Sequence, residues 1–348
     1  MAVIIVSSSN DYHAAAASWA MQEAGLSYVL WEGAGHEVSR QATLEVSPSP
    51  KMKLGSNEVT GSDVVWYRRP RGYSYHPNMA EMDRKFVRPE SIRFTESIDI
   101  LFEALGCRCV NPPGAARSIA RKARQLLLAH TCGFLIPRTL MSNSAPALAC
   151  WMAAESSSYI YKGFQPHVWS NPANGMKAFA QTVKLPESID DLYEQISFAP
   201  GIYQSLVKKV CDVRIVVMGS VTRAFRIVSP ELDWRLEVGA GRAQAEEIEL
   251  PKPILEKIHL FMRRAEIVTG SFDFAVDVDG LWWFLEVNET GQFLWIDQII
   301  PEAGLLQDFL SFLTEQKRDK FPPLAEFTFT PTEAEPAQDP SSLITLEI

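Results

Sequence analysis

Alternation of apolar and polar positions predicts several strands in this chain, and one alternation carries charged side chains. Residues 270–280 (GSFDFAVDVDG) follow a period of two and end in Asp-Gly, a dipeptide typical of a two-residue hairpin turn. If Asp279 and Gly280 form that turn, counting back along both strands places Asp273 directly opposite Glu286. The sequence therefore predicts a hairpin on which two carboxylates face each other.

The same register divides the hairpin into two faces, because side chains alternate along a strand. Asp273, Glu286 and Asn288 lie on one face. The opposite face is apolar and consists of Phe272, Phe274, Val276, Leu285 and Val287. Facing like charges destabilise a bare hairpin, and a divalent cation between them removes that objection. Oxygen ligands favour Mg²⁺ over a softer metal. The alternative is an exposed hairpin edge whose carboxylates are merely solvated.

Strands and helices alternate over the first hundred or so residues, which predicts an α/β fold with a partly parallel sheet. The expected strands lie within 2–9, 27–33, 62–72 and 107–113, and the expected helices span 11–26 and 89–106. The later segments predict a helix over 115–132, a strand over 156–166, two antiparallel strands joined at Gly219 within 201–228, and a helix over 253–268.

The Asn-Pro-Pro step at 111–113 is a natural domain boundary. We expect four segments, namely an N-terminal α/β domain (1–112), a central subdomain (113–200), a C-terminal subdomain that carries the hairpin (201–320) and a tail (321–348). The tail is rich in Pro, Thr and Glu, a composition typical of disordered segments. We therefore expect the tail to be disordered.

Composition limits the functions open to the chain. At 348 residues with 47% hydrophobic content, it can bury a substantial core. Its net charge of −9 argues against a general nucleic-acid binder. No apolar run approaches the roughly 20 residues that span a bilayer, and the first residues lack a signal-peptide pattern, so we expect a cytoplasmic protein without a membrane partner. The five cysteines form no CxxC pair and are expected to be reduced.

Two lysines, a later strand, and then Asp and Glu-x-Asn on a hairpin follow the order typical of the ATP-grasp superfamily. Within it, the chain resembles the peptide ligases that make graspetides of the microviridin type. The stretches similar to theirs are VVWYRRP, NPPGAARSIARKARQLLLAHTCGFLIPRTL, DWRLE (their arginine strand) and FLEVNETGQFLWID (their metal strand). The resemblance spans roughly residues 1 to 320. It implies an N-terminal pre-ATP-grasp domain followed by a glutathione-synthetase-like clamp of two α+β subdomains.

The resemblance also implies a site for ATP and Mg²⁺. The residues implied for ATP are Lys122 and Lys162 at the phosphates, Gln204, Leu206 and Val207 at adenine on the strand 203–207, and Asp212 at the ribose. Those implied for Mg²⁺ are Asp273, Glu286 and Asn288. Compact ammonium groups suit phosphates, and carboxylate and amide oxygens suit Mg²⁺. Without that context, Lys122 is a solvated lysine, and Leu206 and Val207 are ordinary core residues.

The implied activity is an ADP-forming ligation. Asp or Glu side chains of a ribosomally made precursor peptide are phosphorylated, and a Ser or Thr hydroxyl or a Lys amine then attacks the acyl phosphate and closes an ω-ester or ω-amide macrocycle. Arg214 is the first candidate for stabilising the transferred phosphoryl group or the acyl phosphate, and Arg235 is the second candidate, which could bind the acceptor carboxylate. The alternative for either arginine is a structural ion pair, such as Arg235 with Asp233 or Glu237.

Several alternatives stay open in the sequence. A runner-up function is a ligase that adds single amino acids to a protein tail or a small metabolite, and a third is a nucleotide-binding scaffold without turnover. The family resemblance suggests a homodimer. The arginines of RRPR (68–71) either bind acidic residues of the peptide or pair with carboxylates that follow them, such as Glu81, Asp83 or Glu90. The Thr- and Glu-rich tail either imitates a substrate or is a plain extension.

Overall fold

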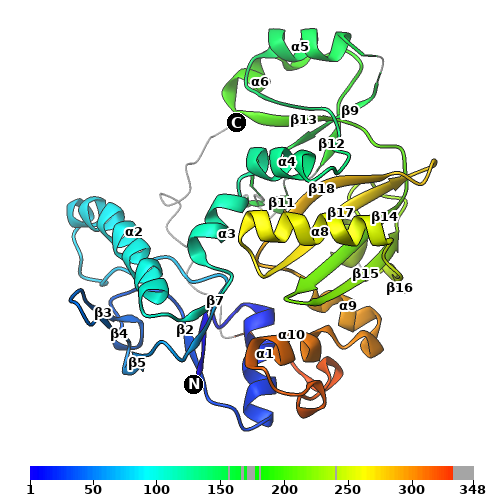
Figure 1. Ribbon diagram of the computed structural model, residues 1–348. Helices are drawn as coiled ribbons and strands as arrows, with labels where there is room; N and C mark the ends of the chain where they lie inside the picture. The colour runs from blue at the N-terminus through cyan, green and yellow to red at the C-terminus, as the bar shows by residue number, and fades with distance from the viewer. Residues whose placement is uncertain (156, 166–167, 171–176, 180–181, 240, 332–348) are drawn as a thin grey trace. The chain divides into compact units, whose positions relative to one another are not determined.

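The computed structural model describes residues 1–331 except 156, 166–167, 171–176, 180–181 and 240. The chain forms two compact units (Figure 1). The first consists of Met1–Gly114 together with the segment that begins at Pro301, and the second of Ala115–Ile300. Both units combine helices and sheets, which confirms the predicted α/β class. Residues 301–320 belong to the first unit, although the sequence grouped them with the hairpin.

A parallel sheet forms the centre of the first unit. Its strand order is β2 (Tyr28–Trp31), β1 (Val3–Val6), β6 (Val64–Tyr67) and β7 (Arg108–Val110), and every pairing is parallel. The inner strands are continuous apolar runs, as expected for a parallel sheet covered on both faces. The helices α1 (Tyr12–Glu23) and α2 (Glu81–Ala104) complete the unit, and the Asp11 side chain caps α1 by accepting from the N–H of Ala14.

The first unit differs from the prediction in two places. Helix α2 starts well before Pro89, because Glu81 and Asp83 interact favourably with the positive end of the helix dipole and Pro89 is accommodated inside the helix. A small antiparallel sheet, absent from the prediction, follows β2 and the 3₁₀ helix η1 (Val38–Arg40), and its strands are β3 (Ala42–Glu45), β4 (Lys51–Leu54) and β5 (Asn57–Val59). Its alternating apolar positions join the core of the unit.

The arginines that follow β6 pair within the first unit. Arg68 is buried, with its Nε 2.6 Å from a carboxylate oxygen of Asp11. The Nε of Arg71 lies 3.2 Å from Glu32. These carboxylates belong to the loops after β1 and β2. Internal ion pairing, one of the two alternatives considered from the sequence, therefore occurs for Arg68 and Arg71, with Asp11 and Glu32 as partners.

Residues 321–331 are ordered against the first unit, which corrects the expectation of disorder for this part of the tail. Phe321 is buried, and the ring of Phe327 lies 5.6 Å from that of Tyr12 and 5.3 Å from that of Trp19. Phe329 lies 5.4 Å from Tyr12. This segment contains η5 (Leu324–Glu326), and the elements before it are η3 (Pro301–Ala303), α10 (Leu305–Thr314) and η4 (Arg318–Lys320). Residues 332–348 lie outside the described residues.

Two main antiparallel sheets build the second unit, together with a two-stranded sheet of β10 (Val168–Ser170) and β11 (Lys177–Phe179). The smaller has the order β12 (Val183–Lys184), β9 (Tyr159–Lys162), β13 (Gly201–Ser205), β8 (Thr139–Ser142), and packs against α5 (Ala145–Ala153) and α6 (Tyr193–Phe198). The larger has the order β16 (Gln244–Ile248), β15 (Val221–Val228), β14 (Lys209–Met218), β17 (Thr269–Asp277), β18 (Trp282–Asn288). Helix α8 (Lys252–Ala265) lies along one face of the larger sheet (Figure 1) and contributes Ile258, Phe261 and Met262 to its core. The remaining elements are η2 (Asp190–Leu192), α7 (Arg235–Gly239) and α9 (Leu294–Ile299).

The helix predicted over 115–132 is in fact two helices, α3 (Pro113–Ile119) and α4 (Lys122–Thr131). The break occurs because Arg121 adopts an extended conformation, with φ −74° and ψ 117°. Lys122 is thus the first residue of α4. One turn later, the buried Gln125 donates to the carbonyl oxygen of Val287 and accepts from its N–H, at 2.9 and 3.2 Å. This glutamine satisfies backbone groups on the outer edge of β18 and holds α4 against it.

Candidate functional site

The hairpin of β17 and β18 places Asp273 opposite Glu286, which confirms the predicted pairing of the two carboxylates. The turn itself is different. The N–H of Asp277 donates to the carbonyl of Leu281, so three residues, 278–280, form the loop instead of two. Gly280 closes this loop with φ 76°, a conformation that glycine adopts without strain.

A β-bulge compensates for the longer turn. Phe274 pairs with Phe284, and the ladder shifts by one residue before Asp273 pairs with Glu286, which leaves Leu285 unpaired. Phe284 is consequently buried in the core, and Leu285 lines a pocket on the opposite face. The prediction that Leu285 belongs to the apolar core face was therefore wrong.

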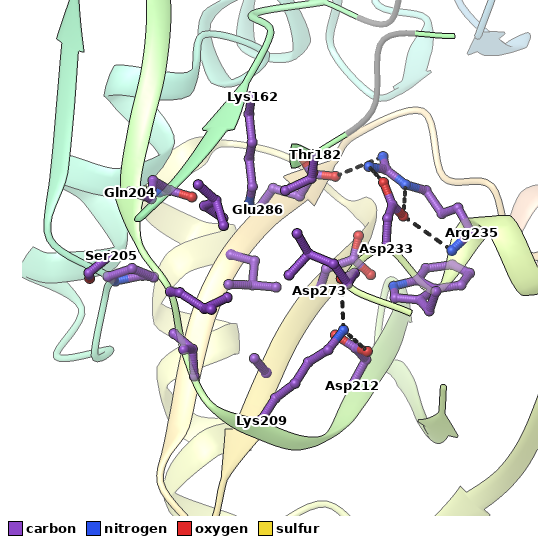
Figure 2. A pocket seen from close by; sticks show the side chains of 18 residues that line it. Lys162, Thr182, Gln204, Ser205, Lys209, Asp212, Asp233, Arg235, Asp273 and Glu286 are labelled. Atoms are coloured by element: carbon purple, nitrogen blue, oxygen red, sulfur yellow. Dashed lines mark hydrogen bonds and ion pairs between the residues drawn. The ribbon is translucent and has the colours of Figure 1, made fainter. Parts of the chain in front are cut away.

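The pocket lies in the second unit, and residues from both of its main sheets line it (Figure 2). It encloses about 690 Å³, part of which is open to solvent. The apolar lining residues are Pro137, Ile160, Leu206, Val207, Leu232, Trp234, Ala275 and Leu285, and the polar ones are Lys162, Thr182, Gln204, Ser205, Lys209, Asp212, Asp233, Arg235, Asp273 and Glu286. Eight of the eleven predicted site residues line the pocket. Lys122 and Arg214 do not line it, but they pair with Glu286 and Asp273, which do.

Glu286 is surrounded by cations. The Nζ of Lys122 lies 2.6 Å from one carboxylate oxygen, and the Nη1 of Arg235 lies 3.8 Å from the other. Burial by itself raises the pKa of Glu286, but Lys122 and then Arg235 overcome this and hold the pKa at about 2. Glu286 is thus an ionised carboxylate at neutral pH, with Lys122 as its main partner.

Asp273 has a different partner. Both of its carboxylate oxygens accept from Nη1 of Arg214, at 2.7 and 2.8 Å, and Nη2 of Arg214 donates to the carbonyl of Gln292 at 2.8 Å. Both side chains of the pair are almost fully buried. Burial raises the pKa of Asp273, and Arg214 opposes that shift. The guanidinium also lies 5.7 Å from the ring of Trp234. Arg214 therefore binds Asp273 and fixes the orientation of its carboxylate.

Lys162 lies at the end of β9 and points into the pocket (Figure 2). Among the described residues, no carboxylate oxygen lies within 4.0 Å of its ammonium group. Desolvation by burial lowers its pKa, an effect that the charge of Glu286 partly offsets. An ammonium group without a close counterion inside a pocket suits an anionic ligand.

Lys209 was missed by the sequence analysis. Its Nζ lies 2.5 Å from a carboxylate oxygen of Asp212 and donates to the carbonyl of Leu232 at 2.9 Å. Residues three apart in a strand point to opposite faces, but a bulge between Lys209 and Cys211 brings Lys209 and Asp212 to one face. Burial raises the pKa of Asp212 to about 6 despite the neighbouring ammonium. A spacing rule for regular strands cannot detect this pair.

Arg235 begins the short helix α7, whereas the sequence resemblance implied a strand. Its Nε and Nη2 bind the two oxygens of Asp233, at 2.7 and 2.6 Å, which is the ion pair considered as the alternative. Asp233, Trp234 and Leu232 all line the pocket and were not assigned to it from the sequence. Two of the three guanidinium nitrogens of Arg235 therefore bind Asp233, and the third, Nη1, faces Glu286.

The segment that follows β13 supplies the apolar wall. Gln204 is buried and its amide donates to the Oγ1 of Thr139 at 2.9 Å, so it is anchored to β8. Leu206 and Val207 both line the pocket. The N–H of Leu206 donates to the carbonyl of Ser158, so this N–H already has a partner within the protein.

Asn288 does not line the pocket, and its side chain bonds within the turn that follows β18. It pairs with Ser271 across the ladder, and its Oδ1 accepts from the N–H and the Oγ1 of Thr290 at 3.2 and 2.8 Å. In the described part of the chain, no group of three or more His, Cys, Asp or Glu side chains is arranged to hold a metal ion. The donors that fit Mg²⁺ are the facing carboxylates of Asp273 and Glu286.

Comparison with solved structures identifies the fold. The chain is similar to a RiPP-associated ATP-grasp ligase from Chryseobacterium gregarium, in complex with ADP and a leader and core peptide, at TM-score 0.75 and 18% identity, covering 91% of this chain and 98% of that one. It is also similar to the macrocyclase MdnC of Microcystis aeruginosa MRC bound with precursor peptide MdnA, at 0.73 and 22%, covering 91% and 100%. A third match is the ATP-grasp ligase PsnB, complexed with a precursor variant, Mg and ADP, at 0.67 and 19%, covering 90% and 97%.

These likenesses establish that the chain has the fold of ATP-grasp ligases over nearly its whole length, which confirms the ATP-grasp fold class that the sequence resemblance implied. The division into a pre-ATP-grasp domain and two clamp subdomains stays a prediction. No protein-family model and no curated protein matches the sequence. Within the part of the chain that the structure describes, no helix has both the length and the apolar character needed to cross a membrane.

Proposed function

We propose that this chain is an ADP-forming ATP-grasp ligase that joins side chains of a ribosomally made precursor peptide into macrocycles. The observation that carries the proposal is one pocket, in a chain with the ATP-grasp fold, that combines an apolar wall, the ammonium of Lys162 and the facing carboxylates of Asp273 and Glu286. The two main sheets of the second unit would be the two subdomains of the nucleotide clamp.

ATP fits the chemistry of this pocket. Leu206 and Val207 offer an apolar surface for adenine, and Lys162 and Lys122 offer ammonium groups for the phosphates. The site holds five cationic side chains, Lys122, Lys162, Lys209, Arg214 and Arg235, against four carboxylates, Asp212, Asp233, Asp273 and Glu286. This excess of positive charge favours an anion in a chain whose overall charge is −9. Asp212, paired with Lys209, would lie at the ribose.

Asp273 and Glu286 would hold Mg²⁺, and Asn288 would join them only if its amide left the turn with Thr290. When bound, Mg²⁺ supplies charge neutralisation at the transferred phosphoryl group. Arg214 holds Asp273 in a fixed orientation through both carboxylate oxygens, as partners of metal ligands commonly do. Arg235 adds a positive charge beside Glu286.

The proposed reaction has two steps. In the first, an Asp or Glu carboxylate of the peptide attacks the γ-phosphorus of ATP and the bond from that phosphorus to the β-phosphate oxygen breaks. ADP is released, and the peptide carries an acyl phosphate. A Ser or Thr hydroxyl or a Lys amine then attacks the acyl carbon, the bond to phosphate breaks, and inorganic phosphate leaves with the proton of the nucleophile. Both steps depend on positioning and charge stabilisation, so no nucleophilic side chain of the enzyme is needed.

The peptide substrate is supported by the neighbouring structures, which were solved with precursor or leader and core peptides. The test is to incubate the protein with Mg²⁺, ATP and a short Thr-, Ser-, Asp- and Glu-rich peptide encoded beside its gene, and to follow peptide mass and ADP. We expect the loss of one water and the release of one ADP for each bond formed. Mass gains equal to amino-acid residues would instead identify a ligase that extends a protein tail or a small metabolite.

A homodimer is part of the same proposal and stays a prediction. Light scattering coupled to size-exclusion chromatography measures the mass of the particle directly. A mass of one chain at working concentrations would contradict this part of the proposal without affecting the chemistry.

A further inference from the structure

We propose that the ion pair between Lys122 and Glu286 makes nucleotide binding and divalent-metal binding depend on each other. The inference rests on the proposed function, because it concerns the same pocket. The Nζ of Lys122 lies 2.6 Å from Glu286, and each member of the pair suits a different ligand. The ammonium group suits a phosphate, whereas the carboxylate suits a divalent cation.

The pair is built into the backbone and is not a chance contact between two mobile side chains. Lys122 is the first residue of α4, and Gln125, one turn along the same helix, makes two hydrogen bonds with the backbone of Val287. Val287 directly follows Glu286 on β18. The helix and the strand therefore hold the backbones of Lys122 and Glu286 in a fixed arrangement, so the two side chains stay within reach of each other.

This pair is also more exposed than the neighbouring pair of Arg214 and Asp273. Lys122 and Glu286 are 27% and 30% exposed, whereas the side chains of Arg214 and Asp273 are 5% and 9% exposed. Arg214 is further anchored by the carbonyl of Gln292, so its partner stays in place. Exchange of partners on ligand binding is consequently expected at Lys122 and Glu286.

The coupling follows from charge alone. A nucleotide that binds Lys122 without metal brings phosphates towards Glu286, whose carboxylate repels them and loses its counterion. A metal that binds Glu286 without nucleotide leaves Lys122 facing a second cation. Arg235 cannot fully replace Lys122, because its Nη1 lies 3.8 Å from Glu286 and its Nε and Nη2 bind Asp233. When both ligands bind together, each charge gains a new partner, so each ligand raises the affinity for the other.

The test is calorimetric titration of the full chain with the ATP analogue AMPPNP, in EDTA and in excess Mg²⁺. For the wild type, we expect Mg²⁺ to tighten binding by roughly 5- to 150-fold. In Glu286→Gln, metal-free AMPPNP should bind about tenfold more tightly than to the wild type, and Mg²⁺ should change the affinity by less than about threefold. The matched control is Glu246→Gln, which removes an exposed carboxylate paired with Arg226 and should behave as the wild type.

The same substitution made in a Lys122→Met protein tests whether the effect of Glu286→Gln comes from the ion pair or only from repulsion between Glu286 and the phosphates. In Lys122→Met, adding Glu286→Gln should raise metal-free affinity by clearly less than the roughly tenfold gain in the native background, because the pair is already lost and only the repulsion between Glu286 and the phosphates is removed. A gain as large as in the native background would overturn the inference. A second overturning result is a Glu286→Gln variant that binds metal-free AMPPNP no more tightly than the wild type does without metal. If the wild type still binds AMPPNP in excess Mg²⁺, the proposed function stands. A folded wild type that binds AMPPNP under neither condition would remove the proposed function itself.

Discussion

Asp273 and Glu286 lie directly opposite each other on β17 and β18, although the turn between the strands is one residue longer than the sequence predicts. The register holds because the bulge at Leu285 absorbs the extra residue. The same bulge turns Leu285 towards the pocket and Phe284 into the core. One irregularity thus builds both the acidic pair and part of the apolar wall beside it.

The bulge predicts unequal costs for two neighbouring truncations. Phe284→Ala should lower the free energy of unfolding by about 3–5 kcal/mol, because it removes a fully buried ring. Leu285→Ala should lower it by less than about 1 kcal/mol, because this side chain borders the pocket. Urea unfolding of both variants measures the difference. Equal costs, or a larger cost for Leu285→Ala, would mean that the regular register is correct.

The buried pair of Arg214 and Asp273 predicts a non-additive effect on stability. Arg214→Met leaves the carboxylate of Asp273 buried without its main counterion and should cost about 3–5 kcal/mol. The double variant Arg214→Met with Asp273→Asn removes the stranded charge and should recover at least half of that loss. Chemical denaturation of Arg214→Met, Asp273→Asn and the double variant gives the free energies of unfolding for this double-mutant cycle. Additive losses would show that the two residues act independently.

Asp212 predicts a pH dependence of stability. Its pKa in the folded protein is about 6, against roughly 3.9 in an unfolded chain, so the folded state binds the proton more tightly. The stabilisation from this proton is fully present below the unfolded pKa and is lost as the pH rises through 6. Between pH 4 and 7, the stability of the wild type relative to Asp212→Asn should fall by about 2–3 kcal/mol. A difference that stays constant or rises over this range contradicts the shifted pKa.

The ordered part of the tail predicts where truncation begins to matter. A chain that ends at Pro331 should keep the stability of the full chain, because the rings on α1 are still covered. A chain that ends at Glu326 loses Phe327 and Phe329 from Tyr12 and Trp19, and should be less stable by about 1–3 kcal/mol. Thermal unfolding of the two truncated chains checks this, and identical midpoints would show that the contacts contribute nothing.

The sequence predicts those parts of the molecule that regular periodicity governs. Helix α8 follows a period of 3.6 and the hairpin with the paired carboxylates a period of two, and the inner parallel strands of the first unit are short continuous apolar runs. The misses occur where backbone irregularities decide the outcome. A bulge places Leu285 in the pocket, another brings Lys209 beside Asp212, and an extended residue at Arg121 splits one helix into two.

The site shows the same division. Site residues on regular strands, such as Lys162 on β9, could be predicted from the sequence, because a charged side chain among buried apolar positions costs free energy unless it has a partner or a ligand. The loop residues Leu232, Asp233 and Trp234 could not, because no periodic pattern fixes where a loop packs. The partner of Arg214 is likewise a matter of tertiary contact, whereas the sequence already offered Asp233 as a partner of Arg235.

The central claim is that this pocket binds a nucleotide through Lys162. The most direct measurement is the affinity of the wild type, of Lys162→Met and of Lys184→Met for AMPPNP in excess Mg²⁺. Lys184 is an exposed lysine on the neighbouring strand β12 and serves as the control. We expect Lys162→Met to bind about 10- to 100-fold more weakly than the wild type, and Lys184→Met to bind as the wild type does. Undiminished affinity in a folded Lys162→Met variant would contradict the claim.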